Sequence, residues 1–151
     1  MRLETSQSRV IPIDADLDLT NMELPKDLNK QFLKDYPNIE LRTSESVAYN
    51  CHGLTFASRR CWISKNSILN VIIEDDKYIE IAMTDVKPGD IVIYFSDKGD
   101  FNHSGVVTEY KPMYASPRIF SKWGNAGEFI HGLTDCPQLY GPHTKFYRCI
   151  L

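Results

Sequence analysis

Two short segments of the chain carry the side chains that nucleophilic catalysis needs. Cys51 stands where a polar, turn-prone stretch gives way to a short helix-like run, and His103 begins an apolar, strand-like run about fifty residues later. The positive end of a helix dipole favours the thiolate form of a cysteine at the helix N-terminus. A histidine within hydrogen-bond reach would hold that thiolate as an ion pair and later pass its proton to a leaving group. The sequence therefore predicts a cysteine hydrolase whose cysteine precedes its histidine.

Helices are expected before the strands. After Pro25, the helical spacing of Leu28, Phe32 and Leu33 predicts a short helix that Pro37 ends. A second helix with one apolar face is predicted from Asn66 or Ser67 to Asp75. Residues 71–73 could equally form a strand.

From Tyr78 onward the hydrophobic period changes to two. This period predicts five strands, at Ile91–Phe95, Ser104–Tyr110, Arg118–Trp123, Glu128–His131 and Thr144–Cys149. Tyr78 to Ala82 is predicted as a short strand or an extended link. Short connectors with Gly, Pro, Asn and Asp favour antiparallel hairpins, so we expect an α+β domain with helices on one face of a single sheet.

Several motifs, taken in order, resemble those of the NlpC and CHAP group of papain-like cysteine peptidases over roughly residues 45–150. In that group a cysteine starts a helix, a Pro-Gly-Asp turn opens the first core strand and a histidine starts the next. A poorly characterised branch also has a tail of the form SKWG…H…P…YG. The matching segments here are Asn50 to Gly53, Pro88 to Val92, His103 to Val107, Ser121 to Gly124, Ile130-His131 and Pro137 to Gly141.

The resemblance implies a papain-like fold, with N-terminal helices packed on one antiparallel sheet of about five strands. We expect residues 1–26 to form an N-terminal arm and residues 27–151 a single hydrolase domain. By the resemblance Cys51 is the nucleophile and His103 the base. Ser121 is the positional candidate for the third residue, which orients the imidazole.

Chemistry favours His131 over Ser121 as that orienting residue, because an imidazole accepts a ring N–H more strongly than a hydroxyl does; Asn125 is a third candidate. The oxyanion hole would use the Cys51 backbone N–H and a further donor from Tyr49 or Asn50. Trp123 is expected either to pack in the core or to stack on substrate. His52 is a second substrate-binding candidate and lies close enough in sequence to Cys51 to crowd the site.

By the resemblance, the expected reaction is hydrolysis of amide bonds, above all those of peptidoglycan stem peptides, by a lysin or a delivered antibacterial toxin. One alternative is a glutamine deamidase or acyltransferase effector that modifies a protein. Another is an inactive member of the fold that binds a peptide. The expected partners are a peptide or peptidoglycan substrate and, for a toxin, a cognate immunity protein.

Composition and charge restrict the other function classes. The net charge of -3 argues against nucleic-acid binding, and no apolar run is long enough to span a membrane. With no signal peptide, we expect synthesis in the cytoplasm, followed by export through a secretion system or release on lysis. The cysteines are expected as reduced thiols, and their spacing does not suit zinc, so neither a metal nor a cofactor is predicted.

Overall fold

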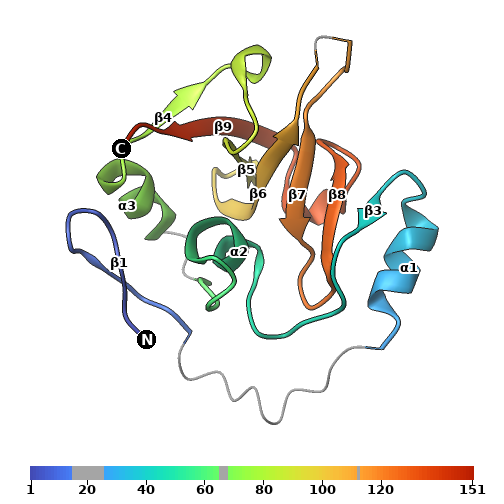
Figure 1. The fold of residues 1–151 in the computed structure, drawn as a ribbon, viewed down its shortest axis with the longest axis horizontal. Helices are drawn as coiled ribbons and strands as arrows, with labels where there is room; N and C mark the ends of the chain where they lie inside the picture. Colours follow the sequence, from blue (N-terminus) through green and yellow to red (C-terminus); the bar gives the residue numbers. More distant parts are fainter. Residues whose placement is uncertain (15–25, 65–67, 112) are drawn as a thin grey trace.

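The computed structural model describes residues 1–14, 26–64, 68–111 and 113–151. This part of the chain folds into a seven-stranded antiparallel sheet, a separate two-stranded hairpin and three α-helices (Figure 1). In chain order the elements are β1 (Leu3–Glu4), β2 (Val10–Ile11), α1 (Leu28–Asp35), β3 (Glu40–Leu41), α2 (Cys51–Ala57), α3 (Ile68–Asp75), β4 (Tyr78–Ile81), the 3-10 helix η1 (Met83–Asp85), β5 (Ile91–Phe95), β6 (Phe101–Glu109), β7 (Arg118–Lys122), β8 (Glu128–Gly132), the 3-10 helix η2 (Gln138–Tyr140) and β9 (His143–Cys149).

The seven-stranded sheet has the strand order β3-β8-β7-β6-β5-β9-β4. Strands β5 to β8 follow one another as hairpins, and β9 returns along the outer side of β5. Every residue of β5 is buried, as expected for a continuous apolar run in the middle of a sheet. His103 lies on β6, the central strand, opposite Tyr94 of β5.

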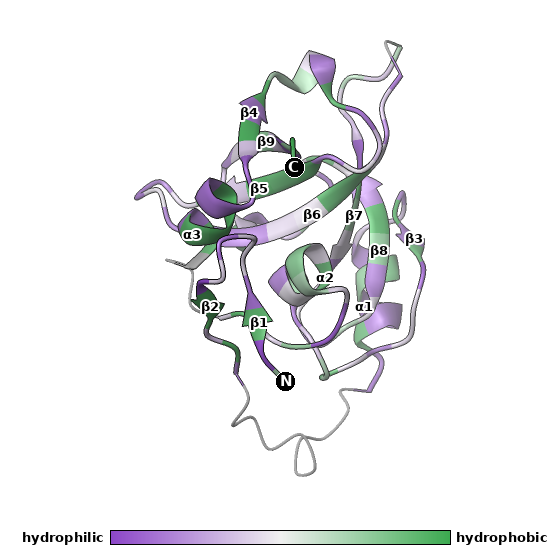
Figure 2. Ribbon diagram, turned by 60° about the vertical axis from the view of Figure 1, so that its left-hand side comes forward, coloured by the Kyte–Doolittle hydropathy of each residue, from purple (hydrophilic) through white to green (hydrophobic). Residues whose placement is uncertain are grey.

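The two faces of the sheet carry separate hydrophobic clusters. Along β5, Val92 and Tyr94 belong to one cluster, which includes Trp123 and Phe129 and against which α1 packs. Ile91, Ile93 and Phe95 belong to the other, which includes residues of α2 and α3. Since side chains alternate along a strand, α1 covers one face while α2 and α3 cover the opposite face. Figure 2 shows α2 in front of β6 and β7.

The predicted fold is wrong in two respects, although α+β is the observed class. The sheet has seven strands rather than about five, and the helices cover both of its faces rather than one. The two extra strands are β3 and β4, one at each edge of the sheet. Both residues of β3 are exposed, so no alternation of apolar and polar residues marks it, and β4 was predicted only as a strand or a link.

The other elements match their predictions to within a few residues. α1 runs from Leu28 to Asp35, and β5 has the predicted bounds. The segment before β4 is the helix α3 rather than a strand, and it ends at Asp75 as predicted. The predicted start of that helix at Asn66 or Ser67 lies outside the described residues.

Part of the predicted N-terminal arm packs on the body. The hairpin of β1 and β2 places Ile11 in the cluster beneath α2 and α3. The buried hydroxyl of Thr5 donates to the Asp75 carboxylate at 2.6 Å, and the Arg9 guanidinium binds the same carboxylate. These contacts join the first residues of the chain to the end of α3.

Candidate functional site

Cys51 is the first residue of α2, and the side chain of Asn50 fixes this helix start. The Asn50 Oδ1 accepts hydrogen bonds from the backbone N–H of Gly53 at 2.8 Å and of Ile63 at 3.1 Å. Its Nδ2 donates to the Ile63 carbonyl at 3.0 Å. The amide is therefore committed to capping α2 and to holding residue 63 beside it, as a good N-cap residue does.

Helix α2 contacts the strand that carries His103 through hydrogen bonds to the neighbouring residue. The Nδ1 of buried His52 lies 2.8 Å from the Ser104 Oγ, which donates to the Thr55 Oγ1 at 3.0 Å. Thr55 in turn donates to the Cys51 carbonyl at 3.0 Å. Desolvation lowers the pKa of His52 to about 4, so His52 serves this contact as a neutral imidazole. His52 thus joins α2 to β6.

The thiol of Cys51 is protonated in this environment. Burial raises its pKa to about 11, and this effect exceeds the opposing ones, which come from the backbone N–H of Ser104, from the helix start and from the Lys122 ammonium. The helix start lowers the pKa of the thiol, which is the direction expected from the helix dipole, but desolvation outweighs this effect. The same neighbours nevertheless provide positive potential at the sulfur once the proton leaves.

The side chain of His103 points away from the face that Ser104 uses to contact α2. Its ring stacks on Tyr140, with centroids 3.8 Å apart and planes 4° from parallel, and meets Tyr94 edge-on at 5.3 Å. It is 1% exposed, and burial lowers its pKa well below the ordinary value. Among the described residues no partner binds its Nε2, and no hydrogen bond joins it to Cys51. Cys51 and His103 therefore form no preformed ion pair, and Tyr140 stacks on His103 and interacts electrostatically with Cys51.

The candidates for the orienting residue form a closed network of their own. The Nδ1–H of His131 donates to the Gly132 carbonyl at 2.7 Å, which leaves Nε2 to accept from the Ser121 hydroxyl at 2.6 Å. The Trp123 Nε1–H donates to the Ser121 oxygen at 3.0 Å. Both ring nitrogens of His131 are thus occupied, and desolvation lowers its pKa to about 4. The indole of Trp123 is 1% exposed, in the core.

Asn125 lies in the turn between β7 and β8, next to the SKWG segment. Its Oδ1 is buried with no partner among the described residues, and its carbonyl accepts from the Ser46 N–H at 3.3 Å. The turn is therefore joined to the loop that precedes Cys51.

A buried charged cluster beside Cys51 was not predicted from the sequence. Glu128 accepts hydrogen bonds from the Tyr49 hydroxyl at 2.7 Å and from the Arg59 guanidinium, and it stands opposite Lys122 in the β7–β8 ladder. The Lys122 Nζ donates to the Ser46 carbonyl at 2.7 Å and lies 5.1 Å from the centre of the Tyr49 ring. Desolvation lowers the pKa of Lys122 to about 8. The available signal was that each charge precedes a large aromatic residue, Trp123 or Phe129, at one end of a predicted strand.

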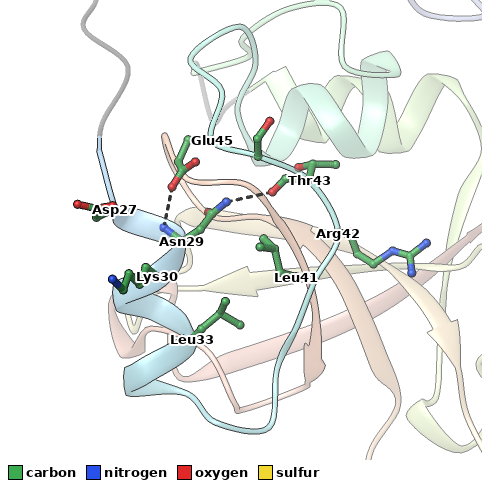
Figure 3. Close-up of a pocket in the computed structure, with 9 residues that line it drawn as sticks. Asp27, Asn29, Lys30, Leu33, Leu41, Arg42, Thr43 and Glu45 are labelled. Carbon is green, nitrogen blue, oxygen red and sulfur yellow. Dashed lines mark hydrogen bonds between the residues drawn. The ribbon is translucent and has the colours of Figure 1, made fainter.

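Two hollows in the described part of the molecule are lined by residues other than Cys51. One hollow, of about 550 Å³, lies between α1 and the following loop. Figure 3 shows residues that line it, among them Leu33, Leu41 and Asn29. Another, of about 470 Å³, is lined by Tyr94, Cys136 and residues of η2 and β9. The second hollow is lined by Tyr94, whose ring meets His103 edge-on.

Two further observations concern ligands and membranes. Within the described residues, no three histidine, cysteine or acidic side chains are grouped as metal ligands would be. None of the helices described here has the length and apolar character that a membrane crossing requires.

In comparisons with family models, with curated proteins and with solved structures, no match to this chain was found.

Proposed function

We propose that the protein is a thiol hydrolase that cleaves amide bonds with Cys51 as nucleophile and His103 as base. The observation that supports this best is the contact of α2 with β6. The helix that begins at Cys51 binds Ser104 of β6 through two of its side chains, and Tyr140, which stacks on the His103 ring, interacts electrostatically with the Cys51 thiol. The Ser104 N–H and the Lys122 ammonium both lower the pKa of the thiol and would stabilise negative charge there.

The reaction begins from neutral side chains. As the substrate carbonyl approaches, the Sγ–H bond of Cys51 breaks, His103 takes the proton, and the sulfur attacks the carbonyl carbon. The C–N bond then breaks, and His103 returns the proton to the leaving amine. Water, deprotonated by His103, attacks the thioester, and the thiol regains its proton as the acid is released. Each cycle consumes one water and leaves both side chains as they began.

The resemblance to the NlpC and CHAP group supports peptidoglycan stem peptides as the substrate. A deamidase or an acyltransferase would form the same thioester and would differ in the amide that enters or in the acceptor that leaves with the acyl group. The burial that raises the pKa of the Cys51 thiol favours a second candidate, a peptide-binding protein without turnover.

The test is incubation of purified muropeptides with wild type, Cys51→Ala and Cys61→Ala, with products identified by mass spectrometry. Cys61 is the matched control, since it is a buried free thiol whose pKa is also raised by burial. We expect cleavage by wild type and Cys61→Ala but not by Cys51→Ala. Cleavage that persists in Cys51→Ala would contradict the proposal. A gain of about one dalton on a glutamine-containing protein substrate would instead identify deamidation.

A further inference from the structure

The environment of His103 differs from that of a histidine held by a hydrogen-bonding partner. The imidazole is 1% exposed, yet its Nε2 has no partner among the described residues. Buried polar atoms are almost always paired, so this one calls for an explanation. In a Cys–His site one ring nitrogen faces the nucleophile and the other binds an orienting group, so an unpartnered ring nitrogen means that a hydrogen-bonded orienting residue is missing on that side.

The polar residues expected in that role are used elsewhere. His131 donates to the Gly132 carbonyl and accepts from Ser121, so neither of its ring nitrogens is left for His103. Ser121 donates its one hydroxyl proton to His131 and accepts from Trp123. What His103 does contact is aromatic: Tyr140 stacks on its plane and Tyr94 meets it edge-on.

Tyr140 is itself held firmly. It ends η2 and is 9% exposed. The next residue, Gly141, has φ 119°, which favours glycine, and a Cβ there would lie 2.2 Å from the Phe95 carbonyl oxygen. The chain after Tyr140 is therefore pressed against β5 in a conformation that other residues rarely adopt. The position of the Tyr140 ring against His103 is therefore fixed by packing.

We infer that Tyr140 is the positioning residue for His103 and takes the place of the hydrogen-bonding third member that the sequence predicts. This inference rests on the proposed function of Cys51 and His103. The stack fixes the plane of the imidazole, because rotation about the side-chain bond would drive the ring into Tyr140. It also places a negative π face against the ring when His103 accepts the thiol proton. That stabilises an imidazolium in a site that otherwise disfavours charge.

The inference is tested on the whole protein with Tyr140→Leu, which removes the ring, and Tyr140→Phe, which keeps the stack. Tyr36→Leu is the matched control, since Tyr36 packs edge-on against Trp123 at 5.3 Å and has no described stack with His103. Two quantities are measured: the titration of His103 by NMR with labelled histidine, and the rate at which iodoacetamide alkylates Cys51. Tyr140→Met replaces Tyr140→Leu if thermal melting shows that the leucine variant is unfolded.

A cation–π contribution to the imidazolium predicts that Tyr140→Leu slows alkylation at pH 7 by about tenfold and moves the His103 titration to lower pH. Tyr140→Phe and Tyr36→Leu should stay within about twofold of wild type, because both keep the stack. Wild-type rates and an unmoved titration in Tyr140→Leu would overturn the inference, provided that His103→Ala slows the reaction. If His103→Ala itself alkylates like wild type, the proposed function fails instead.

Discussion

Gly53→Ala tests whether the position of Cys51 depends on close packing at the start of α2. A Cβ at Gly53 would lie 1.8 Å from the Cys61 carbonyl oxygen and 3.0 Å from the Cys61 carbonyl carbon. Both are backbone atoms, so neither can move away by a change of side-chain rotamer. To restore an ordinary contact of 3.4 Å, α2 and the segment at Cys61 must separate by roughly 1.6 Å.

The expected cost follows from two opposing effects. Alanine in a helix is favoured over glycine by about 1 kcal/mol, whereas overpacking of this severity costs about 3 kcal/mol or more. The net loss of about 2 kcal/mol should lower the melting temperature by roughly 4–8 °C for a chain of this length. A displacement of Cys51 by about 1 Å should also reduce turnover by about a hundredfold.

The assay is thermal unfolding followed by circular dichroism, combined with the muropeptide assay. Gly132→Ala is the matched control, since its Cβ would meet only the Asp135 Cβ at an ordinary 3.5 Å. We expect Gly132→Ala to melt at or slightly above the wild-type temperature. If Gly53→Ala melts as the control does, the packing argument for the position of α2 is refuted.

Three further predictions concern the charged cluster and the helix cap. Glu128→Gln should cost about 2 kcal/mol at pH 7 in urea titrations, a reduced figure because the Arg59 side chain is 48% exposed. Burial acts to raise the pKa of Glu128, but Arg59 and Tyr49 hold it below its ordinary value. Stability from this group is therefore present above about pH 4.3, and the difference from wild type should shrink as the pH falls through the lowered pKa. Lys122→Met should slow alkylation of Cys51 at pH 7 several-fold while changing that of Cys61 little, and equal slowing at both thiols would contradict the electrostatic role. Asn50→Ala should cost about 2–3 kcal/mol in urea titrations, because it removes a helix cap and two bonds to Ile63; a loss under about 0.5 kcal/mol would contradict it.

The sequence predicted the elements with strong local signals. The continuous apolar run of β5 gave its observed bounds, and the change from a polar, turn-prone stretch to a helix-like run indicated the helix start at Cys51. Strand β3 was not predicted, because its two residues are exposed and pair only with β8. Such an edge pairing depends on the partner strand rather than on any pattern of its own.

The geometry of the site depended on tertiary facts that local patterns do not contain. Alternation along β6 shows that His103 and Ser104 point to opposite faces, but not which face α2 covers. Only polar residues were predicted to orient His103, whereas the proposed role of Tyr140 depends on the contact of η2 with β6. Lys122 and Glu128 were overlooked because charged residues in a strand are ordinarily expected to face solvent.

The most direct test of the Cys51–His103 pair is the rate of iodoacetamide alkylation at Cys51 and Cys61, followed by peptide mass spectrometry from pH 6 to 10. Burial raises the pKa of both thiols, so Cys61 reports what burial alone does. Our proposal predicts that Cys51 reacts faster than Cys61 at pH 7 and that His103→Ala removes this advantage. A Cys51 thiol that reacts only at the alkaline end of the range, equally in both proteins, would contradict it.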